Sequence, residues 1–312
     1  MIPKNVLRER VGEALKAAGC VHSLAPVGLM PRLEEILARL VDDGLVDGSL
    51  TEEYRESLSF SCPSEVGETR TIITVATPSQ PAKVRFQLAD GPLDAVVPPT
   101  YISSPAWRRC LRALHGVLGP AGFSVARSTG PVKLLAVHSG LARYGRNNLV
   151  YVNGMGSLVR LDAFCTDADL GAEYHETKGS LRMSSCPPCR NCHHVCPTGC
   201  IPYDGTVIEA GRCLTYYNEH EGDWPIDLDG RVHNSLVGCM RCQATCPANR
   251  YYLRLEKLVA EFDREETEII LEDRPPEELP PSLRAKLAAL DLDEYSTVLG
   301  RNLRALWAHR CT

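Results

Sequence analysis

Cysteines crowd one short part of this chain. Nine of the fourteen fall between residues 182 and 250, a segment with few long apolar runs. They are Cys186, Cys189, Cys192, Cys196, Cys200, Cys213, Cys239, Cys242 and Cys246. Such a segment cannot build a conventional core, and bound metal stabilises segments of this kind instead. Because no secretion signal is visible and the cytosol keeps thiols reduced, we expect metal ligands rather than disulfides.

The spacing of the first cysteines is specific. Cys186-Pro-Pro-Cys189-Arg-Asn-Cys192-His-His-Val-Cys196-Pro197 is CxxCxxCxxxCP, the spacing of bacterial ferredoxins. Three thiolates at intervals of three residues can bind one 4Fe-4S cluster, whereas the fourth normally ligates a neighbouring cluster. The motif therefore predicts a second cluster, whose ligands must come from further along the chain.

That second set is Cys239-Met-Arg-Cys242-Gln-Ala-Thr-Cys246-Pro247, a CxxCxxxCP that lacks one cysteine of the full motif. Cys213 can supply it, and Cys200 is an alternative that the sequence leaves open. We assign Cys186, Cys189, Cys192 and Cys246 to one cluster and Cys196, Cys213, Cys239 and Cys242 to the other. A structural zinc site is disfavoured because zinc does not require two interlocked motifs. Ordinary thiols are expected at Cys20, Cys62, Cys110, Cys165 and Cys311.

The first 170 residues mix two hydrophobic periods. Apolar residues recur at helical spacing up to Gly19 and again from Pro31 to Gly44. The β-branched run Thr71–Thr77 and the alternation at 84–88 indicate strands. Ser104 and Pro105 predict the start of a further helix. This mixture favours an α/β or α+β layered domain.

Three domains are expected from these patterns. Residues 1–180 would form the layered α/β domain, 181–252 a bacterial-ferredoxin-like double-cluster domain, and 253–312 a helical tail. A helix is predicted from Tyr251 to about Glu266, and no segment reads as a membrane span. The formal charge of -5 supplies no overall attraction for a phosphate backbone.

A glycine loop lies at Gly140-Leu-Ala-Arg-Tyr144-Gly145-Arg146-Asn147. It approaches the P-loop pattern, but Arg146 replaces the lysine, Asn147 replaces the hydroxyl residue, and a strand is predicted where a P-loop needs a helix. These glycines either make a tight turn or let the backbone approach a bulky group, and the sequence leaves both interpretations open.

Three segments together resemble a known family. They are GLARYGRNNLVYVNGMGSLVRL (140–161), RCLTYYNE (212–219) and GCMRCQATCPANR (238–250), and they resemble the epoxyqueuosine reductases, whose distant relatives are the reductive dehalogenases. This resemblance implies a nitroreductase-like α/β domain that binds cobalamin beside two 4Fe-4S clusters. It also implies cobalamin contacts at Gly140, Tyr144, Gly145, Arg146, Asn147, Thr215 and Tyr216.

Two departures from that family affect the expected function. The family's proton-donating aspartate precedes a PVLER-like segment, but residues 126–134 carry no carboxylate, so Tyr101, His138 and Tyr144 become the candidate donors. The family also grips tRNA through C-terminal helical repeats, and the acidic stretch after Tyr252 is too short to replace them. A nucleic acid partner is therefore not expected.

The leading hypothesis is thus a cytoplasmic, cobalamin-dependent iron-sulfur reductase of an unidentified small substrate. Its electrons would come from a low-potential donor such as a ferredoxin or flavodoxin. The alternative is an electron carrier or a reductive activator of a corrinoid protein, without a substrate of its own. A third hypothesis is epoxyqueuosine reduction on tRNA.

Overall fold

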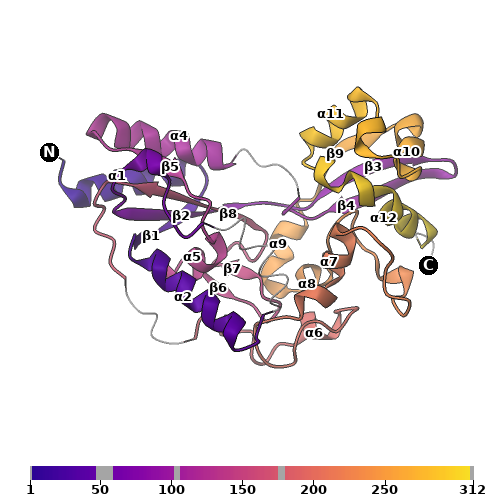
Figure 1. The fold of residues 1–312 in the computed structure, drawn as a ribbon, viewed down its shortest axis with the longest axis horizontal. Coiled ribbons are helices and arrows are strands. Elements are labelled where there is room, and N and C mark those ends of the chain that lie inside the picture. The colour runs from indigo at the N-terminus through magenta and orange to yellow at the C-terminus, as the bar shows by residue number, and fades with distance from the viewer. Residues whose placement is uncertain (1, 47–58, 102–105, 175–179, 310–312) are drawn as a thin grey trace. The chain divides into compact units, whose positions relative to one another are not determined.

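The computed structural model describes residues 2–46, 59–101, 106–174 and 180–309 (Figure 1). The chain forms two compact units that are interleaved in sequence. The first unit comprises 1–78, 104–189 and 204–207, and the second comprises 79–103, 190–203 and 208–312. These units differ from the expected ranges 1–180, 181–252 and 253–312, because residues 82–88 pair both with the neighbouring strand 91–97 and with residues 257–262 near the C-terminus.

The first unit contains a four-stranded antiparallel sheet. Its strand order is β1 (Val21–Pro26), β2 (Thr71–Pro78), β8 (Val159–Thr166) and β5 (Val125–Arg127). The helices of this unit are α1 (Lys4–Ala17), α2 (Leu29–Asp42), α4 (Ala106–Leu118) and α5 (Val132–His138).

Successive side chains of β2 pack against helices on opposite faces of this sheet. Ile73 packs in a cluster with residues of α1 and α4, whereas its neighbour Ile72 packs with residues of α2 and α5. Successive side chains of a strand point to opposite faces, so a strand buried on both sides reads as a continuous apolar run. The expected mixed α/β class is therefore confirmed.

A small hairpin completes the first unit. Its strands are β6 (Ala142–Tyr144) and β7 (Val150–Val152), which pair antiparallel. The strand predicted after the glycine loop is thus confirmed. The apolar run Leu134–Val137 lies within α5, and the predicted cap at Ser104 and Pro105 lies outside the described residues.

The second unit contains the three-stranded sheet β4-β3-β9 and the cysteine-rich segment. Its strands are β3 (Ala82–Leu88), β4 (Gly91–Val97) and β9 (Lys257–Phe262). Its helices are α6 (Asn191–His194), α7 (Leu214–Glu219), α8 (Arg241–Ala244), α9 (Arg250–Leu253), α10 (Arg264–Leu271), α11 (Pro281–Ala289) and α12 (Ser296–Ala308). In the parts of the chain that the structure describes, no helix is long and apolar enough to cross a membrane.

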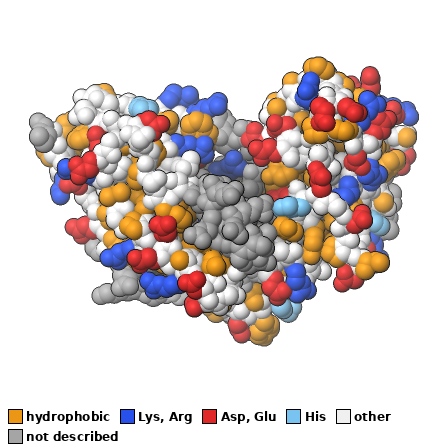
Figure 2. All heavy atoms as spheres, viewed as in Figure 1, with side chains coloured by type: hydrophobic (Ala, Val, Ile, Leu, Met, Phe, Trp, Pro, Cys, Tyr) orange, Lys and Arg blue, Asp and Glu red, His pale blue; other side chains and the backbone are white. Residues whose placement is uncertain are grey.

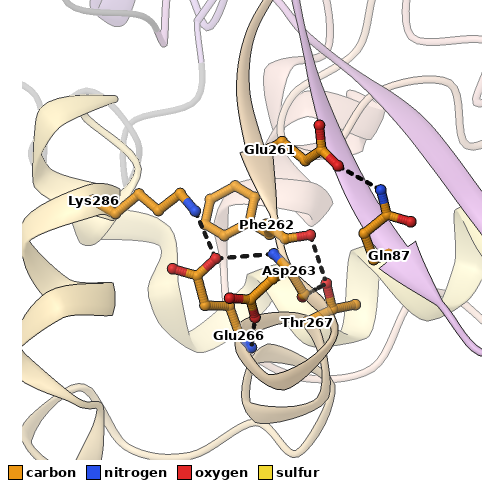
Figure 3. A network of polar contacts seen from close by, with 7 residues as sticks. All are labelled: Gln87, Glu261, Phe262, Asp263, Glu266, Thr267 and Lys286. Atoms are coloured by element: carbon orange, nitrogen blue, oxygen red, sulfur yellow. Dashed lines mark hydrogen bonds and ion pairs between the residues drawn. The ribbon is translucent and has the colours of Figure 1, made fainter.

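The helix predicted from Tyr251 to Glu266 is wrong. Residues 257–262 instead form β9, which pairs parallel with β3 and stacks Phe262 on Phe86 with ring centroids 4.8 Å apart. A capping box then starts α10: the Asp263 carboxylate accepts the Glu266 amide, and the Glu266 carboxylate accepts the Asp263 amide (Figure 3). An N-cap cannot lie inside a helix, so this pattern marks a boundary that apolar spacing alone did not reveal.

Candidate iron-sulfur centre

The two CxxxCP motifs adopt the same local backbone in the second unit. Cys192 lies in α6 and Cys242 lies in α8, and each short helix is followed by a turn into the last cysteine of its motif. The amide of Cys196 donates to His193 O at 3.3 Å, and that of Cys246 donates to Gln243 O at 3.2 Å. Proline follows both cysteines and cannot continue a helix. The repeated motif therefore produces a repeated structure.

Three thiols of the second predicted set gather in this unit, and the competing Cys200 lies with them. The sulfurs of Cys196 and Cys200 are 3.5 Å apart. Hydrogen bonding from Cys200 lowers the pKa of Cys196 to about 4 and that of Cys213 to about 7, and the same bonds raise the pKa of Cys200. The third thiol, Cys239, has its pKa raised mainly by burial and interacts with the charges of Cys213 and Cys196.

Exposure separates Cys200 from the eight assigned cysteines. Every assigned cysteine is partly exposed, whereas Cys200 is 1% exposed. A ligand thiol must face the space that its cluster fills, and a thiol enclosed by protein does not. Cys213 meets this condition better than Cys200, and its assignment as the eighth ligand stays a prediction.

Asn234 contributes to this centre and carries no recognisable sequence motif. Its Nδ2 donates to the Cys239 sulfur at 3.4 Å, and its Oδ1 accepts the Met240 amide at 2.7 Å. A hydrogen bond to a ligating sulfur is one of the factors that set a cluster's reduction potential. No spacing rule identifies such a residue, because its position depends on how the loop from 229 to 239 folds.

The first predicted ligand set draws on both units. Cys186 and Cys189 belong to the first unit, and Cys192 and Cys246 belong to the second, so their assignment to one cluster stays a prediction. Locally, the Cys189 amide donates to Cys186 O at 3.1 Å, which closes a tight turn. Within the described residues, no three His, Cys, Asp or Glu side chains could hold a single metal ion.

The glycines of the 140–147 loop serve the hairpin itself. Gly140 has a φ of 81°, a conformation that favours glycine. A Cβ at Gly145 would overlap the Tyr151 ring and lie 2.7 Å from Asn147 Oδ1. The Asn147 side chain also donates to the Tyr151 hydroxyl at 3.1 Å. The tight turn is therefore observed, together with close packing within the hairpin, and the approach of the backbone to a bulky group stays a prediction.

The remaining predicted cofactor residues differ in exposure. Arg146 and Asn147 are 1% and 3% exposed, whereas Tyr144 is partly exposed, with its pKa raised to about 12 by burial. Thr215 and Tyr216 are partly exposed in α7, where the Tyr216 ring lies 4.0 Å from that of His220. These residues belong to different units, and their common contact with cobalamin stays a prediction.

Lys133 is a neighbour of this loop that the sequence did not suggest. Its Nζ donates to Asn148 Oδ1 at 2.7 Å and lies 6.0 Å from the centre of the Tyr144 ring. Lys133 lies in residues 126–134, the segment that in the resembled family contains the proton-donating aspartate. Helix α5 therefore places an amine beside a candidate proton donor of the hairpin.

The other two candidate donors are held in place by packing. Tyr101 is 7% exposed, donates its hydroxyl proton to Glu219, and has its pKa raised by burial in the core of the second unit. A Cβ at Gly238 would collide with its ring. His138 ends α5, and burial lowers its pKa. Tyr101 is therefore a core residue, whereas Tyr144 keeps a partly exposed ring.

The thiol pattern and the fold both match known proteins. Residues 185–249 match the family model described as the 4Fe-4S double cluster binding domain. The epoxyqueuosine reductase of Pseudomonas aeruginosa is 31% identical over 143 residues, which are 44% of this chain and 37% of that protein. The epoxyqueuosine reductase of Escherichia coli (strain K12) is 34% identical over 120 residues, 38% of this chain and 29% of that protein. The matches thus span about a third of these relatives.

Solved structures extend the likeness in fold. The epoxyqueuosine reductase of Streptococcus thermophilus superposes with a TM-score of 0.67 at 20% identity, covering 97% of this chain and 81% of that one. An epoxyqueuosine reductase with a tRNA-TYR epoxyqueuosine-modified tRNA stem loop gives 0.64 at 17% identity, covering 98% and 82%. The expected resemblance and the double-cluster segment are confirmed, and cobalamin is the further cofactor that the resemblance implies.

Two expectations about function are wrong. The leading hypothesis named an unidentified small substrate, but the relatives are epoxyqueuosine reductases, which was the third hypothesis. A nucleic acid partner was not expected, but one solved relative holds a tRNA stem loop. The net charge is a poor guide to nucleic acid binding, because it sums the charges of the whole chain and does not describe the potential at any one surface. The likeness in fold to the Streptococcus thermophilus structure covers 97% of this chain and 81% of that structure, so it includes most of the residues after Tyr252.

Proposed function

We propose that this protein is an iron-sulfur reductase that removes the epoxide oxygen of epoxyqueuosine in tRNA. The observation that carries the proposal is the set of eight partly exposed cysteines, seven of them in the two CxxxCP motifs and the eighth at Cys213, within a chain whose relatives are named epoxyqueuosine reductases. Removal of the epoxide oxygen breaks two C–O bonds, forms a C=C bond and releases water. The reaction consumes two electrons and two protons.

The electrons would enter from a cytoplasmic low-potential donor of the ferredoxin or flavodoxin class. Cys186, Cys189, Cys192 and Cys246 would hold one cluster, and Cys196, Cys213, Cys239 and Cys242 the other. Thiolates are the ordinary ligands of 4Fe-4S clusters, whose potentials extend to about -700 mV. Cobalamin, when bound, would supply the low-potential centre that this chemistry uses.

The chain's own residues would then position the reactants and supply a proton. Tyr144 of β6 and the neighbouring Lys133 of α5 are well placed for this role, since both keep a polar group near the partly exposed edge of the loop. A hydroxyl whose pKa is raised to about 12 stays protonated at neutral pH. It can therefore donate a proton. Burial lowers the pKa of the nearby Lys133 amine to about 8, so this amine is still mostly protonated at neutral pH and stabilises the phenolate that remains.

Positive charge on α4 is consistent with an RNA partner. The helix carries Arg108, Arg109, Arg112 and His115 and has no acidic residue. Lys and Arg side chains gather over this helix in Figure 2. The Trp107 ring lies 5.2 Å from the Arg108 guanidinium and 4.6 Å from that of Arg127. Arginine beside an aromatic ring is suited to binding phosphates and unstacked bases. The local positive charge of α4 therefore supports RNA binding, although the net charge of the chain is negative.

The test uses anaerobically reconstituted full-length protein with cobalamin, a chemical reductant and a stem loop that contains epoxyqueuosine. Nucleosides from the digested stem loop are analysed by mass spectrometry. We expect loss of one oxygen from the modified base, and no turnover when Cys239 and Cys242 are both replaced by serine. A protein loaded with both clusters and cobalamin that leaves the epoxide intact would refute the proposal.

A further inference from the structure

Arg146 is a fully buried cation in the first unit. Its side chain is 1% exposed, and it is among the largest side chains so enclosed. A guanidinium cannot give up its proton and carries five N–H groups, so its burial is costly unless acceptors surround it. The identity of those acceptors therefore indicates what the residue does.

The acceptors belong to the turn that carries two predicted cluster ligands. Nη2 of Arg146 donates to Cys186 O at 3.0 Å and to Pro187 O at 3.3 Å, and Nε donates to Cys189 O at 3.3 Å. A carboxylate also lies 3.8 Å from Nη1, but it belongs to Asp204, which is 79% exposed. Solvent screens an ion pair of that kind. The main function of the guanidinium is therefore to bind three backbone carbonyls of one turn.

The hairpin that contains Arg146 also forms hydrogen bonds with residues 181–183, just before this turn. The Tyr144 amide donates to Leu181 O at 2.8 Å, and the Met183 amide donates to Tyr144 O at 2.9 Å. Next, the Cys186 amide donates to Met183 O at 3.1 Å. A continuous series of hydrogen bonds thus connects β6 to the first cysteine, and Arg146 extends it to the second.

We infer that Arg146 is a positioning residue that orients Cys186 and Cys189 and raises the reduction potential of the cluster they bind. This inference rests on the proposed function, because it takes these two cysteines as cluster ligands. Reduction adds negative charge to the cluster, and a nearby cation in a dry environment favours that state. Lysine would keep the charge but lose the planar fork that binds three carbonyls at once.

The test compares the full-length wild type with R146K, R146Q and the control R143Q, all reconstituted anaerobically. Arg143 lies in β6, three residues before Arg146, and donates to Ser180 O, but its side chain is exposed. Iron content, the electron paramagnetic resonance of the reduced clusters and their midpoint potentials are measured. In R146Q we expect one cluster to be lost or to shift to a more negative potential with an altered signal, and the other to stay as in the wild type. R146K should alter the signal with a smaller shift in potential, and R143Q should match the wild type.

Three outcomes would overturn the inference. They are an R146Q protein with wild-type potentials and signals, an equal effect on both clusters, and an R143Q protein that changes as R146Q does. If R146Q and R146K both lose their secondary structure, Arg146 is a general core residue and the inference also fails. A wild type without 4Fe-4S clusters would remove the proposed function as well, whereas an unchanged R146Q in a two-cluster protein removes this inference alone.

Discussion

At the scale of single residues, the side-chain amide of Asn234 hydrogen-bonds both the sulfur of Cys239, a predicted cluster ligand, and the backbone amide of Met240. Its replacement by alanine removes the N–H to the Cys239 sulfur and leaves the Met240 amide without its acceptor. We expect a more negative potential for one cluster, because a lost hydrogen bond to sulfur disfavours the reduced state. Stability should fall by about 1–3 kcal/mol for an unsatisfied amide. Potentiometry and chemical denaturation measure the two effects.

The exposed Asn153 of the hairpin provides a matched control for that change. Asn153→Ala should leave both potentials at their wild-type values. Equal potentials in the Asn234→Ala protein and the wild type would show that the contact with Cys239 has no electronic role.

Tyr101 provides a second test at this scale. Tyr101→Phe keeps the ring in the core and removes only the hydroxyl that donates to Glu219. We expect turnover of the stem loop to persist and stability to fall by about 1–3 kcal/mol, since a partly buried acceptor loses its donor. Tyr144→Phe should instead reduce turnover and leave stability nearly unchanged. A Tyr101→Phe protein that folds but does not react would return Tyr101 to the catalytic candidates.

At the scale of elements, the boundary between β9 and α10 depends on Asp263. Asp263→Ala removes the side-chain acceptor of the Glu266 amide (Figure 3), and we expect a loss of about 1 kcal/mol in the free energy of unfolding. Asp263→Asn should retain most of the stability, because asparagine also caps helices well. Thermal and denaturant unfolding distinguish these variants. A fully stable alanine variant would mean that packing of Phe262 alone sets the boundary.

The surface of α4 can be tested separately. Replacing Arg108 and Arg112 with glutamate should weaken stem-loop binding and lower the slope of log affinity against log salt by about one for each lost phosphate contact. Arg39→Glu on α2 is the control, because Arg39 is also exposed and pairs with Glu35 on its own helix. Fluorescence anisotropy over a range of salt concentrations gives both quantities. Equal losses in both proteins would indicate a general charge effect rather than contact at α4.

At the scale of the whole molecule, the two units differ in what stabilises them. The first has an apolar sheet with helices on both faces, whereas residues 190–203 and 208–250 of the second are short turns and helices around thiols. Removal of iron by a chelator should therefore increase amide exchange in 190–250 and leave β2 and β8 protected. Hydrogen exchange with mass spectrometry measures this contrast. Uniform exchange across both units would show that the fold depends on the clusters throughout.

The sequence by itself determined the features that depend on local spacing. CxxCxxCxxxCP and CxxxCP predicted the double-cluster segment, and hydrophobic period predicted α1, α2, β2 and β3, because both signals are properties of nearby residues. Only the tertiary structure decided the pairing of β9 with β3, the burial of Arg146 against the Cys186 turn and the contact of Asn234 with Cys239. Each of these joins residues whose separation in sequence, or whose loop conformation, no periodic pattern specifies.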